Sequence, residues 1–345
     1  MESIYYVMSW ACHRRCKHCY ETRFRPYDAA EMKGVLAEAV ANFPRIVDAF
    51  PETMLYRDRA DGGRVKRGRV ILSGGESLLD PIRENVTYKV IERLRDKYAD
   101  RGGVKIVVQT TGDLVTPAIV DDLLARGVWM ISCAGLDDFH VNIKAEKLKA
   151  ELTRTFESRG MTQSGLGTQD RKWLDEDGPV FSFFGATPDT WIGKIWPRGR
   201  AWENDLSHAT LADDFCARWS GGLDFLRHGE SGAEVSVEPD GAVYPCCLKT
   251  KMPIGNLLED KLIDILDSLK GDPAFEAISA GDPRRMGLAD GWSVADFEAA
   301  SRTKTPSGRD YQNLCIGCDR FFETKMAARI EAAKARRRAM RETAP

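Results

Sequence analysis

Three cysteines within eight residues constrain this chain more than any other feature of its sequence. Cys12, Cys16 and Cys19 have the spacing C-x3-C-x2-C, and they directly follow residues 4–8, an apolar run typical of a short buried strand. Three thiolates from one loop make a metal site without a fourth protein ligand, whereas a structural zinc site is closed by four ligands. Thiolates also hold iron–sulfur clusters. We therefore expect a cubane cluster in which one iron is free to take an exchangeable ligand.

This loop resembles the signature of the radical S-adenosylmethionine (SAM) superfamily. The resemblance implies that the free iron of a [4Fe-4S] cluster binds the amino and carboxylate groups of SAM, and that the reduced cluster releases a 5′-deoxyadenosyl radical. His18 stands where the family usually has an aromatic or similar ring, so we include it among the cofactor-binding residues. Two other interpretations stay open at this point. The cysteines could be unrelated buried residues, or the pair Cys315 and Cys318 could complete a zinc ribbon.

Composition narrows the class of protein. The chain has 345 residues, of which 43% are hydrophobic and 30% charged, so we expect a large domain and a smaller one with ordinary globular composition. The formal net charge of −2 favours neither nucleic acid nor membrane as a partner. No apolar run approaches the ~20 residues of a membrane span. An odd count of nine cysteines and the absence of a signal peptide favour a reducing, cytoplasmic location.

Apolar runs alternate with helical patterns at the spacing of βα units. Expected strands cover residues 4–8, 70–72, 104–108, 128–132 and 180–184, and helices begin near residues 28, 81 and 117. Residues 51–69, rich in Arg, Asp and Gly, are expected to form a solvated loop. The fold class that we predict is α/β, a partial (β/α)6 TIM-like barrel followed by a small α+β auxiliary domain. In such barrels the active site lies at the carboxyl ends of the strands.

Two motifs follow strands of this expected barrel. Gly74, Gly75 and Glu76 resemble the family's GGE motif, which implies backbone contact with the SAM amino group. A side chain at Gly75 should therefore weaken SAM binding and leave the iron content near normal. Ser132 stands where a polar side chain often meets the SAM ribose or carboxylate, but the acid of the family's Ser-x-Asp-Gly pattern is missing here. Cys133 should face the helices as a small buried hydrophobe.

Arg198 and Arg200 lie in a Pro-Arg-Gly-Arg-Ala turn after the last expected barrel strand, similar to a turn in many family members. The guanidinium group suits a carboxylate, so we assign both residues to a carboxylate of SAM or of the substrate. Pairing with nearby acidic side chains is an equally good interpretation.

A second group of cysteines lies beyond residue 210. Strands are expected at residues 233–237 and 243–244 and a helix at 262–269, and the region resembles the SPASM/twitch extension of radical SAM enzymes. The resemblance implies an auxiliary [4Fe-4S] cluster held by four thiolates, which come from Cys216, Cys246, Cys315 and Cys318. Full ligation indicates an electron relay. Cys247 could exchange roles with its neighbour Cys246. The interval from Cys216 to Gly241 is longer than the usual SPASM spacing, and the cysteines are too few for two auxiliary clusters, so the count favours a twitch-type module with one cluster.

These features predict a barrel at residues 1–210, an auxiliary cluster domain at 211–324 and a basic helix at 325–345. The last segment has seven Lys or Arg against two Glu, and packing on the outside of the barrel is favoured over contact with nucleic acid. We expect oxidation or bond formation on a small molecule, with flavodoxin or ferredoxin as reductant. The alternatives are modification of a peptide or protein, as in RiPP or sulfatase-modifying enzymes, and a non-catalytic metal-stabilised binding module. Because the first strand is expected at residue 4, we expect no leader-binding domain before it.

Overall fold

The expected barrel strands pair in one sheet of the computed structural model, in the order β11-β10-β9-β1-β4-β5-β6-β8-β7. The structure describes residues 1–134, 139–140, 144–164, 177–185, 194–216 and 223–342. The parallel strands are β1 (Ser3–Val7), β4 (Arg69–Ser73), β5 (Lys105–Thr110), β6 (Met130–Cys133), β7 (Thr162–Gln163), β8 (Val180–Phe183) and β9 (Glu234–Val237). The α/β class with a parallel sheet is confirmed, and the sheet is open in the described part of the chain.

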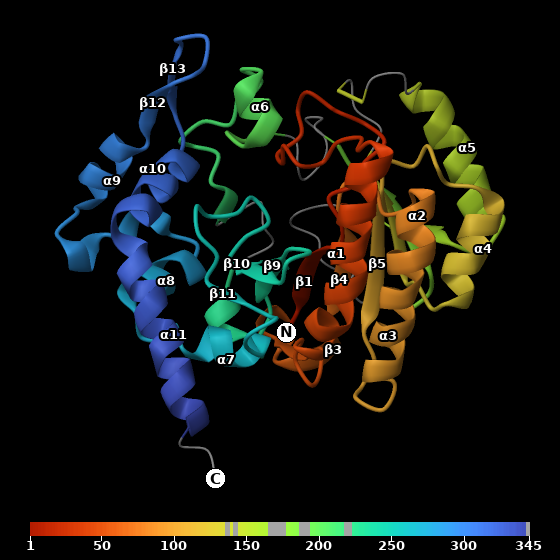
Figure 1. Cartoon of the computed structure of the whole chain (residues 1–345), viewed down its shortest axis with the longest axis horizontal. Helices are drawn as coiled ribbons and strands as arrows, with labels where there is room; N and C mark the ends of the chain where they lie inside the picture. The colour runs from red at the N-terminus through yellow and green to blue at the C-terminus, as the bar shows by residue number, and fades with distance from the viewer. Residues whose placement is uncertain (135–138, 141–143, 165–176, 186–193, 217–222, 343–345) are drawn as a thin grey trace.

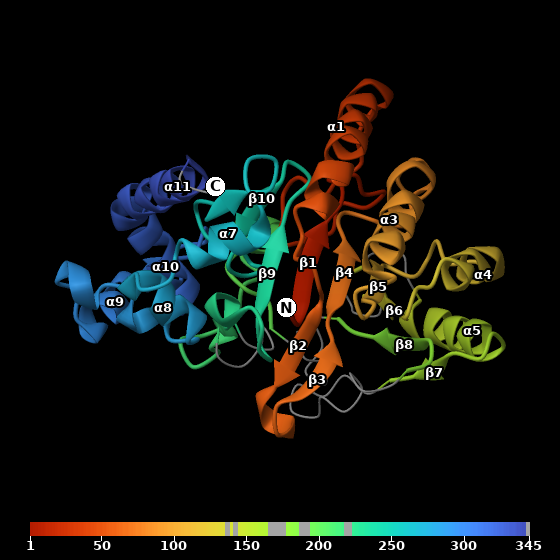
Figure 2. The ribbon, with the colours of Figure 1, turned by 90° about the horizontal axis from the view of Figure 1, so that it is seen from below.

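Helices cover the outer face of this sheet, as Figure 2 shows. They are α1 (Ala29–Asp48), α2 (Asp80–Ile82), α3 (Tyr88–Tyr98), α4 (Pro117–Ala125) and α5 (Ala145–Glu157), with a π-helical turn at Arg83–Thr87 between α2 and α3. The first helix begins where its sequence indicates, because Asp28 and Glu31 form a capping box. This arrangement leaves the inner face and the carboxyl ends of the strands to the loops.

The expected auxiliary region continues the same sheet. Strand β9 pairs with β1, and β10 (Ala242–Tyr244) and β11 (Gly255–Asn256) add antiparallel strands beyond it. The other elements lie on that side of the sheet (Figures 1 and 2): α7 (Leu262–Asp267), α8 (Pro273–Ser279), α9 (Val294–Ala300), α10 (Leu314–Phe321), α11 (Ala327–Glu342) and the hairpin of β12 (Arg302–Lys304) and β13 (Asp310–Gln312). The short helix α6 (Gly199–Glu203) lies near the top of Figure 1.

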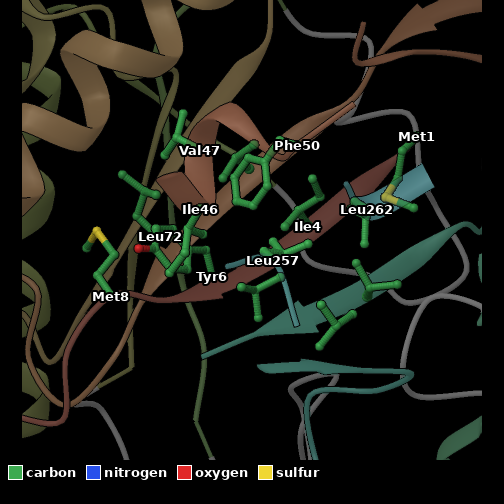
Figure 3. Close-up of a cluster of buried hydrophobic side chains, with 14 of the residues drawn as sticks. Met1, Ile4, Tyr6, Met8, Ile46, Val47, Phe50, Leu72, Leu257 and Leu262 are labelled. Atoms are coloured by element: carbon green, nitrogen blue, oxygen red, sulfur yellow. The ribbon is translucent and has the colours of Figure 1, made fainter. Parts of the chain in front are cut away.

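One hydrophobic core joins the two regions. Ile4 and Tyr6 of β1 are fully buried, and Phe50, just after α1, packs edge-on against Tyr6. Leu257 and Leu262 from the auxiliary region belong to the same cluster (Figure 3). Because each of these side chains loses its contact with water only when both regions are in place, the interface is part of the folded core.

The inner face of the sheet changes from apolar to polar toward its carboxyl edge. Val107, Met130 and Val180 lie side by side on neighbouring strands and form an apolar cluster. Two residues further along the strands, Ser132 lies between Gln109 and Ser182. Since side chains of a strand alternate between faces, these polar groups line the same inner face, directly below the loops that carry the motifs.

The prediction of a solvated loop at residues 51–69 was wrong. Strands β2 (Leu55–Asp58) and β3 (Arg64–Arg67) form an antiparallel hairpin there, with two glycines of positive φ in its turn. Met54 and Tyr56 are buried, so the segment has an apolar side that the many charges around it conceal in the sequence. Among the described residues, no helix is long and apolar enough to cross a membrane.

The basic tail forms helix α11 and packs against its own chain. Five of its basic residues bond to the segment from residue 259 to residue 290, and they are Arg329, Lys334, Arg336, Arg337 and Arg341. The bond from Arg337 Nε to Asp260 Oδ2, at 2.7 Å, is buried. All of these partners lie in the expected auxiliary region, so the tail packs there and not on the outside of the barrel as expected, and its positive charge pairs within the chain.

Candidate functional site

The cysteine loop leaves the carboxyl end of β1 and folds back on itself. Cys12 is buried, and Cys16 and Cys19 are half-buried; all are free thiols. The backbone N–H of Cys12 donates to the carbonyl of Arg25 at 3.1 Å, and that of Cys19 donates to the carbonyl of Cys16 at 3.3 Å. Burial raises the pKa of Cys12 to about 12, and the nearby thiols of Cys16 and Cys19 add to the rise. The Cys12 thiol therefore lies near those of Cys16 and Cys19.

The Gly-Gly turn after β4 is packed against this loop. Gly75 N–H donates to the carbonyl of Ser9 at 3.1 Å, and Glu76 N–H donates to the carbonyl of Ala11 at 2.9 Å. A Cβ atom on Gly75 would lie 2.2 Å from the Ala11 oxygen and 2.8 Å from the Cβ of Cys12. The close approach that requires glycine is thus to the cysteine loop. Gly74 meets the same loop, since its Cβ would lie 2.7 Å from the Ser9 oxygen.

The Glu76 carboxylate joins the carboxyl ends of two strands. It is 2% exposed and accepts hydrogen bonds from Leu78 N at 2.9 Å, Thr110 Oγ1 at 2.7 Å, and both the N–H and the Oγ1 of Thr111 at 2.8 Å. A buried carboxylate with four donors is well satisfied. These contacts support a bracing role for Glu76, and its predicted contact with SAM stays a prediction.

Asp113 is a site residue that the sequence analysis missed. It follows β5 and bonds to His13 Nε2 at 2.9 Å and to Arg14 Nη2 at 2.5 Å, both from the interval between Cys12 and Cys16. Burial acts to raise the pKa of Asp113, but hydrogen bonds from His13, Thr111 and Arg14 hold that pKa below its usual range. The signal in the sequence was its place in Thr-Thr-Gly-Asp, directly after a predicted strand.

His18 lies among aromatic rings, as its position in the motif suggests. Its ring centroid is 4.8 Å from that of His140 and 5.1 Å from that of Phe139. His140 follows β6, so the contact brings another strand end to the cysteine loop. Asp137 and Asp138, which also follow that strand in the sequence, lie outside the described residues.

Arg200 holds the cysteine loop by its carbonyl groups. Its guanidinium donates from Nε to Cys16 at 2.9 Å, from Nη1 to Thr22 at 2.7 Å and from Nη2 to Phe24 at 2.6 Å, and the residue is buried. The adjacent Ala201 N–H donates to the carbonyl of Cys19 at 3.1 Å. With each nitrogen bonded to the backbone, Arg200 is placed to shape the loop, and its predicted contact with a carboxylate stays a prediction.

Arg198, two residues earlier, lies at the second cysteine group. It forms a two-point pair with Asp319, with N–O distances of 2.9 and 3.0 Å, and donates to the carbonyls of Leu248 and Lys249. Asp319 directly follows Cys318. The alternative interpretation of pairing with an acidic residue therefore describes Arg198 in the structure, and a role toward the SAM carboxylate finds no support.

The four predicted auxiliary ligands come together. Burial raises the pKa of Cys216 well above its usual value. The nearby thiols of Cys246, Cys315 and Cys318 raise that pKa further. Cys247 also lies near Cys246 and Cys315, and its thiol acts in addition on Tyr5 and Tyr20, half-buried tyrosines whose hydroxyls lie 3.3 Å apart. The assignment of Cys246 rather than Cys247 as the ligand stays a prediction.

Ser132 and Cys133 face opposite sides of β6. The Oγ of Ser132 lies 2.8 Å from the Oγ of Ser182 on the inner face. Cys133 is fully buried in the main core, and burial raises the pKa of its thiol. The structure confirms the expected alternation, and the contact of Ser132 with SAM stays a prediction.

Both cysteine groups suit a cluster by their donor chemistry. Among the described residues, no three His, Cys, Asp or Glu side chains are grouped closely enough to hold a single metal ion. In a four-iron cluster each thiolate binds its own iron, so the sulfur atoms stand further apart than the ligands of one ion. Burial raises the pKa of Cys19, but the positive charges of Arg200 and Lys249 act to lower it. The Arg198 guanidinium lies near the auxiliary thiols in the same way. Nearby positive charges favour the thiolate, which is the form that binds a metal.

Comparison with known proteins identifies the second region. Residues 231–319 match the family model of SPASM, described as an iron-sulfur cluster-binding domain. The match confirms the expected SPASM-type auxiliary region and its cofactor class. No curated protein matches the chain.

Solved structures with similar arrangements have low sequence identity. They include BtrN in complex with AdoMet and 2-DOIA (13% identity, 82% of this chain and 89% of that chain covered, TM-score 0.43) and anSMEcpe with bound AdoMet and the Cp18Cys peptide (14%, 96% and 99%, 0.42). SuiB of Streptococcus suis bound to S-adenosylmethionine is a third (12%, 84% and 67%, 0.36).

A substitution at Arg200 tests whether it shapes the cysteine loop. Arg200→Lys keeps the positive charge, but its single nitrogen cannot occupy the three separate positions from which Nε, Nη1 and Nη2 reach the loop carbonyls. We expect the variant to lose about half or more of the iron of the first site, since each lost buried bond costs about 1–3 kcal/mol. Iron analysis of the reconstituted protein measures this. Arg126→Lys, at the residue that directly follows the outer helix α4, is the control, and normal iron in Arg200→Lys would contradict the assignment.

Proposed function

We propose that this chain, whose residues 231–319 form a SPASM iron–sulfur cluster-binding domain, is a radical SAM enzyme. One observation carries the proposal. The loop with Cys12, Cys16 and Cys19 is held between the Gly75 turn and Arg200, at the carboxyl edge of a parallel sheet, with a match to a SPASM domain beside it. A loop fixed from two sides positions three thiolates and leaves the fourth coordination position to a ligand.

The residues of the chain divide the work between the two sites. Cys12, Cys16 and Cys19 would hold the first cluster, which when bound supplies one electron to SAM and so releases the 5′-deoxyadenosyl radical. His18 lies beside the loop, where its ring can stack on a flat group of the ligand. The inner-face hydroxyls of Ser132 and Ser182 can donate and accept hydrogen bonds to a ligand above the sheet.

We further propose oxidation or bond formation on a small polar molecule. A single set of four auxiliary thiols supports one relay cluster. The sequence analysis likewise expects one auxiliary cluster and a small-molecule substrate. The row of Gln109, Ser132 and Ser182 supports an uncharged, hydrogen-bonding substrate group, because it offers hydroxyls and an amide but no charge. An arriving charged group would find no opposite charge in this row.

Release of 5′-deoxyadenosine from SAM tests the proposal. The anaerobically reconstituted protein is reduced with dithionite in the presence of SAM, and the product is quantified by chromatography. We expect multiple equivalents of 5′-deoxyadenosine over time. A protein that holds zinc, or holds iron but leaves SAM intact under strong reductant, would overturn the proposal in favour of a metal-stabilised binding module.

The auxiliary ligand assignment gives a separate prediction. Cys246→Ala should remove the auxiliary cluster, because it deletes one of four thiolates, whereas Cys247→Ala should leave at least about three quarters of the iron. Both variants should still cleave SAM slowly without substrate, since the first site keeps its ligands. Iron analysis and electron paramagnetic resonance distinguish the two variants. Loss of the cluster in Cys247→Ala alone would show that the ligand is the adjacent residue.

A further inference from the structure

A group of four charged side chains connects the two cysteine regions, and three of them, Glu21, Glu238 and Lys249, are largely buried, whereas Arg23 is 43% exposed. Arg23 donates to Glu21 from Nε at 2.9 Å and from Nη2 at 2.8 Å, and also to Glu238 Oε1 at 3.0 Å. Lys249 Nζ bonds to both carboxylates, those of Glu21 and Glu238. The two positive and two negative charges balance, which is the condition under which buried charges are tolerated.

Each member lies close to a cysteine or a strand of one region. Glu21 is two residues after Cys19, and Lys249 is three residues after Cys246. Glu238 directly follows β9, and its side chain is 1% exposed. The side chains of Glu21 and Lys249 are only 9% and 13% exposed, so the bonds between the regions are largely shielded from water. Shielding makes them stronger and makes an unpaired member costly.

Trp10 covers the group from the side of the first loop. The Arg23 guanidinium lies 3.6 Å from the centroid of the Trp10 ring, and Lys249 Nζ lies 5.2 Å from it. Both cations therefore interact with the π face of a residue that precedes the first cysteine. The same aromatic ring is buried, so the group is closed on this side as well.

The backbone of Lys249 is held in an unusual conformation. Its φ of +63° lies in the left-handed region, which costs a residue with a Cβ atom roughly 1–2 kcal/mol. Its carbonyl accepts a bond from Arg198, and its N–H donates to the carbonyl of Cys246 at 3.1 Å. Glycine would relieve the strain, so the lysine side chain is the feature that this position requires.

We propose that Lys249 is a positioning residue that couples the order of the first cysteine loop to the auxiliary cysteine region. When the loop from Cys246 to Lys249 is fixed by its cysteine ligation, the ammonium group is fixed as well, and it holds Glu21 and so the end of the loop that carries Cys19. The first cysteine loop is thus more ordered when the auxiliary site is formed, although its own three ligands remain in place without that site. The inference rests on the proposed function only in that both cysteine groups bind a metal cluster.

Hydrogen–deuterium exchange measures this coupling without reference to turnover. Backbone amides of residues 16–25 are compared in the reconstituted wild type and in a Cys315→Ala, Cys318→Ala variant, which removes auxiliary ligation. We expect exchange in this segment to be about tenfold faster in the double variant, the effect of a coupling energy of ordinary size. In a Lys249→Met background, the same removal should change exchange less than about threefold.

Matched variants separate coupling from general destabilisation. Lys304→Met removes an exposed lysine that pairs with Asp310 in the same region, and the full tenfold effect should persist there. Lys249→Arg keeps the charge and should restore most of the coupling, while Lys249→Gly relieves the backbone and should not. A tenfold effect that survives in Lys249→Met, or that only tracks global unfolding in all variants, would overturn the proposal. If the protein binds zinc in place of iron, the proposed function is wrong, but the exchange experiment still tests the coupling between the two cysteine regions.

Discussion

The triple variant Cys12→Ala, Cys16→Ala, Cys19→Ala is expected to retain about half of the iron of the wild type and to form no 5′-deoxyadenosine. The wild type should hold about eight irons, as two four-iron clusters. The three substitutions delete all protein ligands of the first cluster and none of the four auxiliary thiols. Iron analysis and product chromatography after anaerobic reconstitution measure both expectations.

Cys133→Ala is the matched control for the triple variant, because Cys133 is a free thiol buried in the main core. We expect it to keep both its iron and its SAM cleavage. The account would be contradicted by SAM cleavage that persists in the triple variant, since the radical site would then lie elsewhere. Loss of all iron would show instead that the auxiliary site depends on the first loop.

Gly75→Ala is expected to lower the iron content of the first site to less than about half. The added Cβ would lie 2.2 Å from the Ala11 oxygen, an approach that real Cβ atoms do not make, and would press on the Cβ of Cys12. Backbone atoms on both sides must move, and overpacking of this kind costs about 1–3 kcal/mol or more. The expected loss of iron differs from the expectation drawn from the sequence, which was weaker SAM binding with a nearly normal iron content.

The control for Gly75→Ala is Gly229→Ala, where an added Cβ meets no atom within 4 Å. Iron and SAM affinity should both stay near their wild-type values in the control. If Gly75→Ala keeps its iron and loses only SAM affinity, the turn contacts SAM as the family resemblance implies, and its packing on the cysteine loop is then tolerant.

The sequence predicted the longer strands of the sheet well, because they are short apolar runs, whereas the two-residue strands β7 and β11 were not predicted. Ile4 and Tyr6 on β1 and the capping box of Asp28 and Glu31 behave as local rules indicate. The hairpin at residues 55–67 was missed, since Met54 and Tyr56 are its few buried members among many charges. Its pairing depends on contacts that a local pattern does not contain.

The arginine turn shows where prediction of the site from the sequence stopped. Motif resemblance placed Arg198 and Arg200 together at a ligand carboxylate, but their partners are Asp319 and the carbonyls of the cysteine loop. Asp319 is 121 residues away from Arg198, and no local pattern reveals such a pair. For the same reason the charged group around Lys249 could not be predicted, although the cysteines themselves could.

Electron paramagnetic resonance of the reduced protein with and without SAM tests most directly the claim that only the first site has an open coordination position. In the Cys315→Ala, Cys318→Ala variant, which keeps the first site alone, we expect the cluster signal to shift when SAM is added. In the Cys12→Ala, Cys16→Ala, Cys19→Ala variant, which keeps the auxiliary site alone, the signal should not respond to SAM. A SAM-dependent shift of the auxiliary signal, with none from the first site, would contradict the account.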